Sequence, residues 1–263
     1  MLGLTTSGFR PTISGILKKL GLYRRLEWTP LHRWFVSFNN PSYDRAQNIE
    51  FEFYRRFVGS GSLVFDVGAN VGSKSELFLR LGAQVVAVEP DLRCCQILRQ
   101  RFPFQRRFHL APKALGSSVG RLELFISEPG SAYNTLSRKW RDFTHTDSGT
   151  HMSVDVTTAD ALIGVFGTPQ FIKIDVEGFE QDVLIGLSTT IQIISFEANL
   201  PLFRSETLSC IDRLIEINPE YRFYVRDDLT GYLGDKDSIS GADARRIASE
   251  RAQYCEIFAV ITK

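Results

Sequence analysis

The feature that most constrains the fold of this 263-residue chain is the alternation of short apolar runs with amphipathic stretches over residues 62–199. The runs Leu63–Val67, Gln84–Val88 and Phe171–Ile174 have the length of buried strands, and glycines or polar residues follow them. Strands separated by helices of this length form right-handed βαβ units and build a parallel sheet. Further strands are expected at 122–126, 154–156, 191–196, 221–225 and 255–261, and helices at 72–81, 92–101, 179–187 and 202–217.

The composition is that of a folded protein without a strong charge. Hydrophobic residues make up 43% of the chain, and 31 Lys and Arg nearly balance 30 Asp and Glu, for a net charge of +1. Such a chain has no overall electrostatic attraction to nucleic acid. No apolar run reaches the roughly 18 to 20 residues that cross a bilayer, so no transmembrane segment is expected. The four cysteines form no CxxC pair, which favours reduced thiols in a cytoplasmic protein.

Residues 1–57 are expected to form a helical and aromatic extension, and residues 58–263 a cofactor-binding domain. Apolar residues fall at helical spacing between Ile13 and Leu20, and residues 1–35 contain six Lys and Arg against one acid. A basic helix of this kind either packs on the main domain with its charges in water or lies weakly on a membrane surface. We expect the extension to help select the substrate.

A glycine-containing loop, Asp66–Gly72, follows the first predicted strand and opens the next helix. Glycines there let backbone amides approach a ligand, and the helix N-terminus adds positive potential. Glu89 ends the next strand, 23 residues after Asp66. A carboxylate at that position accepts hydrogen bonds from both hydroxyls of an adenosine ribose. The two features predict a nucleoside cofactor at the carboxyl edge of the sheet.

The same loop favours S-adenosylmethionine (SAM) over a dinucleotide. Counted from Gly68, the second and third glycines of the dinucleotide pattern G-x-G-x-x-G are replaced by Asn70 and Ser73. SAM has no pyrophosphate for the backbone to approach, and its ammonium suits a carboxylate such as Asp66. Two alternatives stay open: an NAD(P)-dependent oxidoreductase, which would lack its phosphate-binding loop, and a non-catalytic SAM-binding partner protein.

Several motifs resemble those of the FkbM-type methyltransferases. They are Asp66–Gly72, Val88–Pro90, Ala114–Gly116, Ile194–Glu197 and, most specifically, the string FIKIDVEGFE at Phe171–Glu180. The resemblance covers about residues 51–199. It implies a class I (Rossmann-like) methyltransferase fold, with a mostly parallel seven-stranded sheet and helices on both faces. It also implies transfer of a methyl group from SAM to a hydroxyl on a glycan, polyketide or other natural product. The positions expected to bind the cofactor are Asp66, Gly68, Ala69, Asn70, Gly72, Glu89, Pro90, Ala114 and Leu115.

Carboxylates converge on the same sheet edge and predict the reacting centre. Asp175 follows a strand end, Glu177 comes two residues later, Glu180 opens the next helix and Glu197 ends the next strand. An alcohol reacts poorly while protonated, so a base or a metal is expected beside it. We expect Asp175 to act as the general base or to orient the acceptor, with Glu177 and Glu197 in support. Part of the cluster is explained if Glu180 caps its helix and Lys173 neutralises a neighbouring carboxylate.

Other assignments of the reacting centre remain open from the sequence. A magnesium ion held by Asp175 and Glu197 would replace the base, since carboxylate oxygens are its preferred ligands. His145 and His151 are alternative bases. Tyr133, Asn134 and Trp140 belong to the same predicted loop, Glu128–Thr150, and are candidates for contact with the acceptor.

Overall fold

The computed structural model describes residues 41–127, 134–144, 150–227 and 237–261. The helix expected near Ile13–Leu20 lies outside these ranges, and so do Tyr133 and His145. The chain divides into two compact units, residues 1–47 and 48–263. The second unit begins ten residues before the boundary expected from the sequence, because Phe53 and Tyr54 in the second half of α4 (Pro41–Tyr54) are fully buried in its core.

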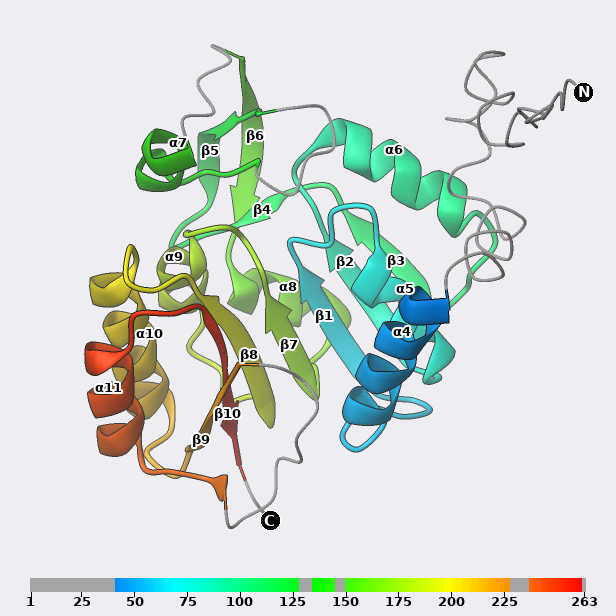
Figure 1. The fold of residues 1–263 in the computed structure, drawn as a ribbon. Helices are drawn as coiled ribbons and strands as arrows, with labels where there is room; N and C mark the ends of the chain where they lie inside the picture. The colour runs from blue at the N-terminus through cyan, green and yellow to red at the C-terminus, as the bar shows by residue number, and fades with distance from the viewer. Residues whose placement is uncertain (1–40, 128–133, 145–149, 228–236, 262–263) are drawn as a thin grey trace, which may run out of the picture. The chain divides into compact units, whose positions relative to one another are not determined.

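One seven-stranded sheet forms the centre of the larger unit (Figure 1). Its strand order is β3-β2-β1-β7-β8-β10-β9, and every neighbouring pair is parallel except the two that involve β10. This confirms the predicted α/β fold with a mostly parallel seven-stranded sheet. The strands are β1 (Leu63–Val67), β2 (Gln84–Val88), β3 (Phe108–Ala111), β7 (Phe171–Ile174), β8 (Ile193–Ala198), β9 (Arg222–Arg226) and β10 (Cys255–Val260).

The strands β1 and β7 lie side by side in the middle of the sheet, with Val64 opposite Phe171 and Asp66 opposite Lys173. Both strands are buried on both faces, which is why they read as continuous apolar runs in the sequence. Their carboxyl ends therefore place the loops that follow them next to one another. The polar exception, Lys173, is only 2% exposed.

Helices cover both faces of the sheet, as predicted (Figure 1). On one face, Phe53 and Tyr54 of α4 and Phe78 of α5 (Ser73–Arg80) pack with Phe171, and Leu98 of α6 (Leu92–Arg101) packs against Ala87. The opposite face is covered by α8 (Ala159–Phe166), α9 (Glu180–Ile185), α10 (Arg204–Ile217) and α11 (Gly241–Glu250), whose buried residues belong to the largest apolar cluster.

A second, three-stranded sheet lies beyond the carboxyl ends of the central strands (Figure 1). It has the order β4-β6-β5, with β4 (Ala114–Leu115), β5 (Gly120–Phe125) and β6 (His151–Thr157), and α7 (Arg138–Thr144) is inserted between β5 and β6. The strands expected at 122–126 and 154–156 are therefore present, but they belong to this small sheet and not to the central one. Its position lets it form one wall of the site described below.

Helix α11 is not among the helices expected from the sequence. The helix buries only Ala244 and Ala248, so its apolar stripe is too weak to stand out in the sequence. Its start is fixed by Ser240, whose hydroxyl accepts a hydrogen bond from the backbone amide of Asp243 at 3.1 Å.

All four cysteines are free and buried. Among the residues that the structure describes, no helix has both the length and the apolar character needed to cross a lipid bilayer.

Candidate functional site

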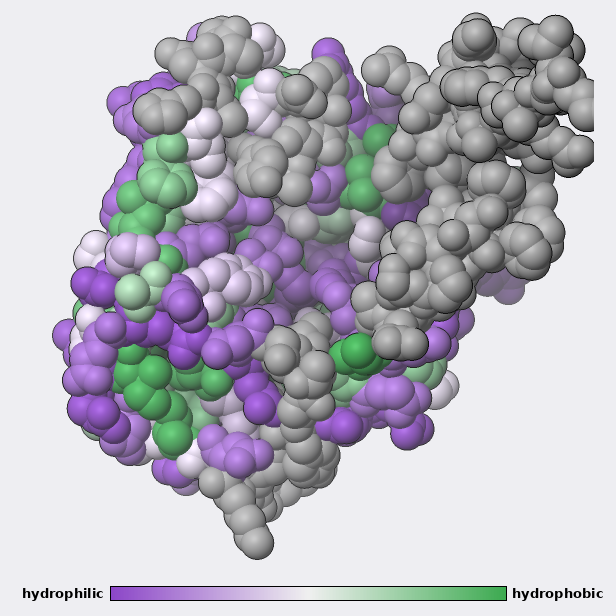
Figure 2. Space-filling model, in the orientation of Figure 1, coloured by the Kyte–Doolittle hydropathy of each residue, from purple (hydrophilic) through white to green (hydrophobic). Residues whose placement is uncertain are grey.

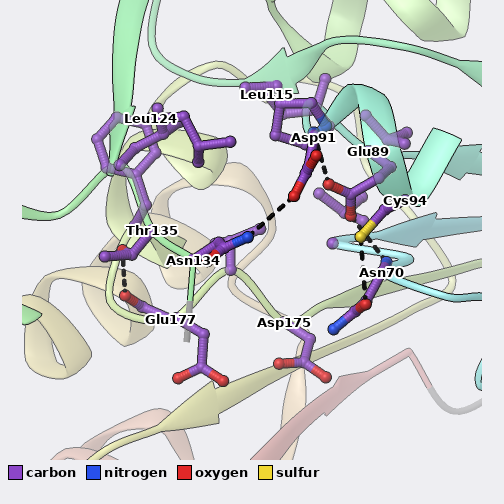
Figure 3. A pocket seen from close by; sticks show the side chains of 18 of the residues that line it. Asn70, Glu89, Asp91, Cys94, Leu115, Leu124, Asn134, Thr135, Asp175 and Glu177 are labelled. Carbon is purple, nitrogen blue, oxygen red and sulfur yellow. Dashed lines mark hydrogen bonds between the residues drawn. The ribbon is translucent and has the colours of Figure 1, made fainter. Parts of the chain in front are cut away.

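A cavity of about 200 Å³ lies at the carboxyl ends of β1, β2, β7 and β8, beneath the small sheet (Figure 3). Strand β1 pairs with β2 on one side and with β7 on the other. The loops that follow β1 and β7 therefore turn toward opposite sides of the sheet and leave a crevice between them. Crevices of this kind are where open α/β sheets bind ligands. In the space-filling view, hydrophilic side chains gather around a hollow in the middle of the face shown (Figure 2).

Glu89 forms one side of the cavity and is 6% exposed. One carboxylate oxygen accepts the backbone amide of Asn70 at 2.7 Å, and the other accepts that of Asp91 at 2.8 Å. Burial raises the pKa of Glu89 to about 7, although these two amides act in the opposite direction. Glu89 thus ties the loop after β1 to the loop after β2 and presents a carboxylate to the cavity. Pro90, Ala114 and Leu115, predicted with it, also line the wall.

The loop after β1 brings only two of its predicted residues, Gly68 and Asn70, to the cavity wall. Gly68 has a φ of 80°, and a Cβ atom there would lie 1.8 Å from the backbone oxygen of Asp175. The sequence predicts close approach of a ligand at this glycine, which does line the cavity. Gly68 also lets the loop pack against the end of β7.

The remaining loop residues lie behind the cavity wall. The Asp66 carboxylate is 2% exposed and accepts a hydrogen bond from the Ser75 hydroxyl at 2.6 Å. Ala69 is buried beside Leu98 and Ala87, and Gly72 is the residue before α5, with a φ of 85°. Burial raises the pKa of Asp66, and the Ser75 hydroxyl lowers it in part. These residues shape the loop. Asp66 was expected to bind the ammonium of SAM, but its carboxylate does not line the cavity.

Three carboxylates meet on the other side of the cavity. One oxygen from each of Asp175, Glu177 and Glu197 lies within 4.8 Å of the other two. Asp175 follows β7, Glu177 lies in the next turn and Glu197 is in β8, which pairs with β7. In Figure 3, Asp175 and Glu177 lie side by side, across the cavity from Glu89. The convergence expected from the sequence is therefore present in the structure.

Lys173 supplies positive charge beneath this cluster. Its ammonium donates to the Asp175 carboxylate at 2.7 Å, and its side chain is 3% exposed. Burial opposes the charged form, but the carboxylates of Asp175, Glu256 and Glu197 outweigh it and raise the pKa of Lys173. Asp175 is thus held in place by a buried cation, as the sequence analysis expected for a neighbour of Lys173.

Lys173 also acts on the two glutamates of the cluster, but it does not outweigh their burial. Burial and the nearby Asp175 carboxylate raise the pKa of Glu177 to about 8. The same two causes raise the pKa of Glu197, whose carboxylate also accepts a hydrogen bond from the Tyr254 hydroxyl at 2.9 Å. The cluster therefore combines a carboxylate paired with a lysine and two carboxyl groups whose pKa values are raised toward neutral pH.

Glu177 is held in an unusual backbone conformation, with a φ of 52°. Its carbonyl oxygen accepts a hydrogen bond from the Thr135 hydroxyl at 2.7 Å, which comes from the segment between β5 and α7. The following turn is fixed by Glu180, whose carboxylate accepts the backbone amides of Val176 and Gly178, both at 3.2 Å. Glu180 thus fixes the turn before α9 but does not cap the helix as expected, because the residue before the helix is Phe179 and no side chain there accepts a helix amide. Left-handed backbone at a non-glycine residue is typical of functional sites.

Of the described loop residues expected to touch the acceptor, one lines the cavity and the other does not. Asn134 lines the cavity and donates its side-chain amide to the Asp91 carboxylate at 2.9 Å (Figure 3). Trp140 is 8% exposed and packs on Phe203, away from the wall. His151 is exposed on β6 near Glu123, so it does not join the carboxylate cluster as a base.

Sequence reasoning did not assign several residues of the wall to the site. Asp91 lines the cavity and also caps α6 by accepting the amide of Arg93 at 2.8 Å. Cys94, Lys113 and Thr135 reach the cavity through the tertiary arrangement of α6 and the small sheet. Asp91 and Phe179 had a local signal, since each lies two residues after a predicted site residue, Glu89 or Glu177.

The comparisons with known proteins include a family model that matches more than half of the chain. The sequence model of the family described as "Methyltransferase FkbM domain" matches residues 66–225. Ribosomal RNA small subunit methyltransferase A of Synechococcus sp. (strain JA-2-3B'a(2-13)) is 47% identical over 47 residues. That match spans 18% of this chain and 17% of the relative.

Three solved structures illustrate the structural neighbours. Precorrin-6y C5,15-methyltransferase from Geobacter metallireducens GS-15 has a TM-score of 0.44 at 12% identity, with 81% of this chain and 87% of that chain covered. The O-methyltransferase from Bacillus cereus in complex with SAH has a TM-score of 0.43 at 11% identity, covering 96% and 93%. Aeropyrum pernix fibrillarin with natively bound S-adenosyl-L-methionine has a TM-score of 0.43 at 11% identity, covering 78% and 68%.

Proposed function

The chain belongs to the FkbM methyltransferase family, and we propose that it transfers the methyl group of SAM to a hydroxyl of a glycan, polyketide or other natural product. The family match over residues 66–225 includes the glycine loop, Glu89 and the carboxylate cluster. The observation that carries the choice of a hydroxyl acceptor is this cluster, in which Asp175, Glu177 and Glu197 converge opposite Glu89. A hydroxyl is the acceptor that most needs a carboxylate, because it must lose a proton to react.

The residues on the Glu89 side of the cavity fit SAM. Each Glu89 oxygen already accepts one backbone amide and retains lone-pair capacity for a ribose hydroxyl. Pro90, Cys94 and Leu115 provide apolar surface beside it for the adenine ring. The backbone of Gly68 and Asn70 borders the same space toward Asp175. SAM supplies an electrophilic methyl group on a sulfonium when it is bound.

The carboxylate cluster supports a division of labour in the acceptor half. Asp175 is fixed by the Lys173 ammonium, which suits a group that orients the acceptor hydroxyl. Glu177, with a pKa raised to about 8, is better suited to take up the proton near neutral pH. Methyl transfer is an in-line displacement, so holding the hydroxyl in line with the methyl group supplies much of the rate. We assign the first role to Asp175, the second to Glu177 and support of both to Glu197.

Substitution of the two carboxylates tests this assignment. Asp175→Asn and Glu177→Gln keep the shape of each side chain, so SAM affinity measured by calorimetry should stay near that of the wild type. Methyl transfer to an identified acceptor should fall by the roughly 10²- to 10⁴-fold expected for a lost general base in Glu177→Gln. It should also fall in Asp175→Asn, because the group that orients the acceptor hydroxyl is lost. The wild-type rate should rise with pH toward about 8, since Glu177 must be ionised to accept a proton, and Glu177→Gln should lack that rise.

Full activity of both variants would remove the cluster from the reaction. A magnesium ion held by Asp175 and Glu197 is the competing explanation, and the three converging carboxylates are the observation in its favour. We expect chelator treatment to leave the wild-type rate unchanged, because Lys173 already supplies the positive charge beside Asp175. Loss of activity with EDTA and recovery with magnesium would show that a metal takes the role assigned to the base.

Two other functions are tested alongside. Parallel titration with NAD would detect an oxidoreductase, and SAM binding without turnover would indicate a non-catalytic protein.

A further inference from the structure

A second cavity, of about 480 Å³, lies under the small sheet. Residues of β5 and β6, the loop after β4 and the start of α9 form its wall, and all of them are described by the structure. The volume falls within the roughly 300 to 1,000 Å³ typical of ligand pockets. None of the residues assigned above to the cofactor or to the carboxylate cluster lines it.

The two cavities share part of their walls. Leu136 and Phe179 line both. Phe179 comes two residues after Glu177 in the chain, and Thr135, next to Leu136, holds the Glu177 carbonyl at 2.7 Å. A molecule in the second cavity therefore shares the walls at Leu136 and Phe179 with the cavity that holds the carboxylate cluster. This is the position expected for the part of an acceptor that extends beyond its reacting hydroxyl.

The wall of the second cavity is rich in hydroxyls and carries balanced charge. Ser117, Ser118 and Ser153 supply hydroxyls, while Arg121 and Arg138 are matched in number by Glu123 and Asp182. Apolar surface comes from Leu122, Phe125, Leu136, Val156 and Phe179. Some of these groups already interact, since Arg121 lies 3.6 Å from Asp155 and Glu123 lies 3.8 Å from His151. An anionic ligand would be opposed by the two carboxylates, and a wholly apolar one would offer no hydrogen bonds to the polar groups that it covers.

An uncharged polyol with an apolar face satisfies both parts of this wall. Its hydroxyls can donate to carboxylates such as Asp182 and accept from serine and arginine groups. Asp182 already accepts the Ser117 hydroxyl at 3.4 Å and keeps further acceptor capacity. The C–H face of a sugar ring suits the aromatic surface of Phe125 or Phe179. We propose that the second cavity binds a neutral glycosyl unit of the methyl acceptor, an inference that rests on the proposed hydroxyl methylation.

Two glycines provide a matched pair of variants. A Cβ atom added at Gly120, in the wall of the second cavity, would meet nothing within 4 Å, and the same holds for Gly164 on the exposed side of α8. Neither glycine has a φ in the left-handed region. Gly120→Trp therefore adds bulk at the cavity wall, and Gly164→Trp adds the same bulk elsewhere. Both variants should remain folded by circular dichroism.

The experiment measures binding of sugars directly, by saturation-transfer NMR, with and without S-adenosylhomocysteine. The probes are neutral methyl glycosides of glucose, galactose, mannose, xylose and rhamnose, with methyl glucuronide and cyclohexanol as charged and apolar comparators. The wild type and Gly164→Trp should transfer saturation to at least one neutral glycoside and less to both comparators. Gly120→Trp should weaken this binding by at least about tenfold and leave SAM affinity within about twofold in calorimetry.

The outcomes separate this proposal from the proposed function. Absence of binding to every neutral glycoside, preference for either comparator, or equal binding by Gly120→Trp would each overturn the glycosyl assignment. The SAM titration is independent of these results. Failure of the wild type to bind SAM would instead contradict the methyltransferase proposal. Sugar binding at the second cavity would still be decided by the saturation-transfer measurement alone.

Discussion

Glu89 combines a structural and a binding function in one carboxylate. Both of its oxygens accept backbone amides, from Asn70 and from Asp91. Glutamine has the same shape but only one accepting oxygen, so Glu89→Gln would turn an amide NH₂ toward one of these backbone donors. We expect SAM affinity to weaken by roughly 1.5 to 3 kcal/mol, the range for a lost charge-assisted hydrogen bond. Calorimetric titration measures the change, with the exposed Glu250→Gln as the control. Equal affinities of Glu89→Gln and the wild type would exclude Glu89 from the site.

Lys173 is the residue whose loss should most affect stability near the site. Its ammonium is buried at 2.7 Å from Asp175 and also faces Glu197 and Glu256. Lys173→Met keeps much of the volume but leaves these carboxylates without the cation. Removing one partner of a buried ion pair costs about 3 to 5 kcal/mol. We therefore expect Lys173→Met to lower the free energy of unfolding, measured with urea, by about this amount. The half-exposed Lys139→Met, which breaks an ion pair with Glu206, should change it by less than about 1 kcal/mol.

The site residues that could be predicted from the sequence are those that belong to a short local motif. Glu89 and Asp175 each follow a recognisable strand, so their side chains were placed at one sheet edge from the chain order alone. Asn134 was expected near the acceptor only as a member of the predicted loop Glu128–Thr150, and Thr135 was not expected there. Thr135 reaches the cavity because the small sheet folds over it, a long-range arrangement that no local spacing of residues indicates.

At the scale of elements, the turn after β1 depends on the end of β7. Gly68 leaves no room for a side chain, because a Cβ atom would lie 1.8 Å from the backbone oxygen of Asp175. We expect Gly68→Ala to lower the free energy of unfolding by more than about 2 kcal/mol, through left-handed strain and this clash. Gly164→Ala, in the open surface of α8, should raise it by about 0.5 to 1 kcal/mol. Urea unfolding of the two variants compares them, and a harmless Gly68→Ala would contradict the observed packing.

The elements that sequence reasoning found and missed differ in how much apolar surface they bury. The bounds of β1, β2, α6 and β7 are as predicted, because their apolar patterns and caps are strong. The two-residue strand β4 and the alanine-faced helix α11 carry almost no periodic signal. Both are formed by pairing or packing with distant parts of the chain.

At the scale of the whole molecule, the buried acids control how stability depends on pH. Burial raises the pKa values of Glu89 and Glu180 to about 7 and that of Glu177 to about 8, from an ordinary value of 4.5. Between these values, the folded protein holds protons that the unfolded chain has released. The free energy of unfolding should therefore fall as pH rises from about 5 to about 8.

Thermal unfolding across this pH range tests the sign. One pKa unit corresponds to about 1.4 kcal/mol, and about 1 kcal/mol moves Tm by roughly 2 to 4 °C for a chain of this size. We expect Tm to be several degrees higher near pH 5.5 than near pH 8.5. Glu177→Gln should flatten the dependence, whereas the exposed Glu220→Gln should not. A Tm that rises with pH over this range would contradict the burial of these carboxyls as protonated groups.

The separation of the chain into a central and a small sheet has an evolutionary consequence. Strands β5 and β6 pair with each other over six positions, and neither pairs with the central sheet. Substitutions in these strands can accumulate without disturbing the register of β1 with β2 and β7, on which the Glu89 side of the cavity depends. A gene of this kind can therefore change one short stretch by drift and selection while the pairing of its central strands is inherited unchanged.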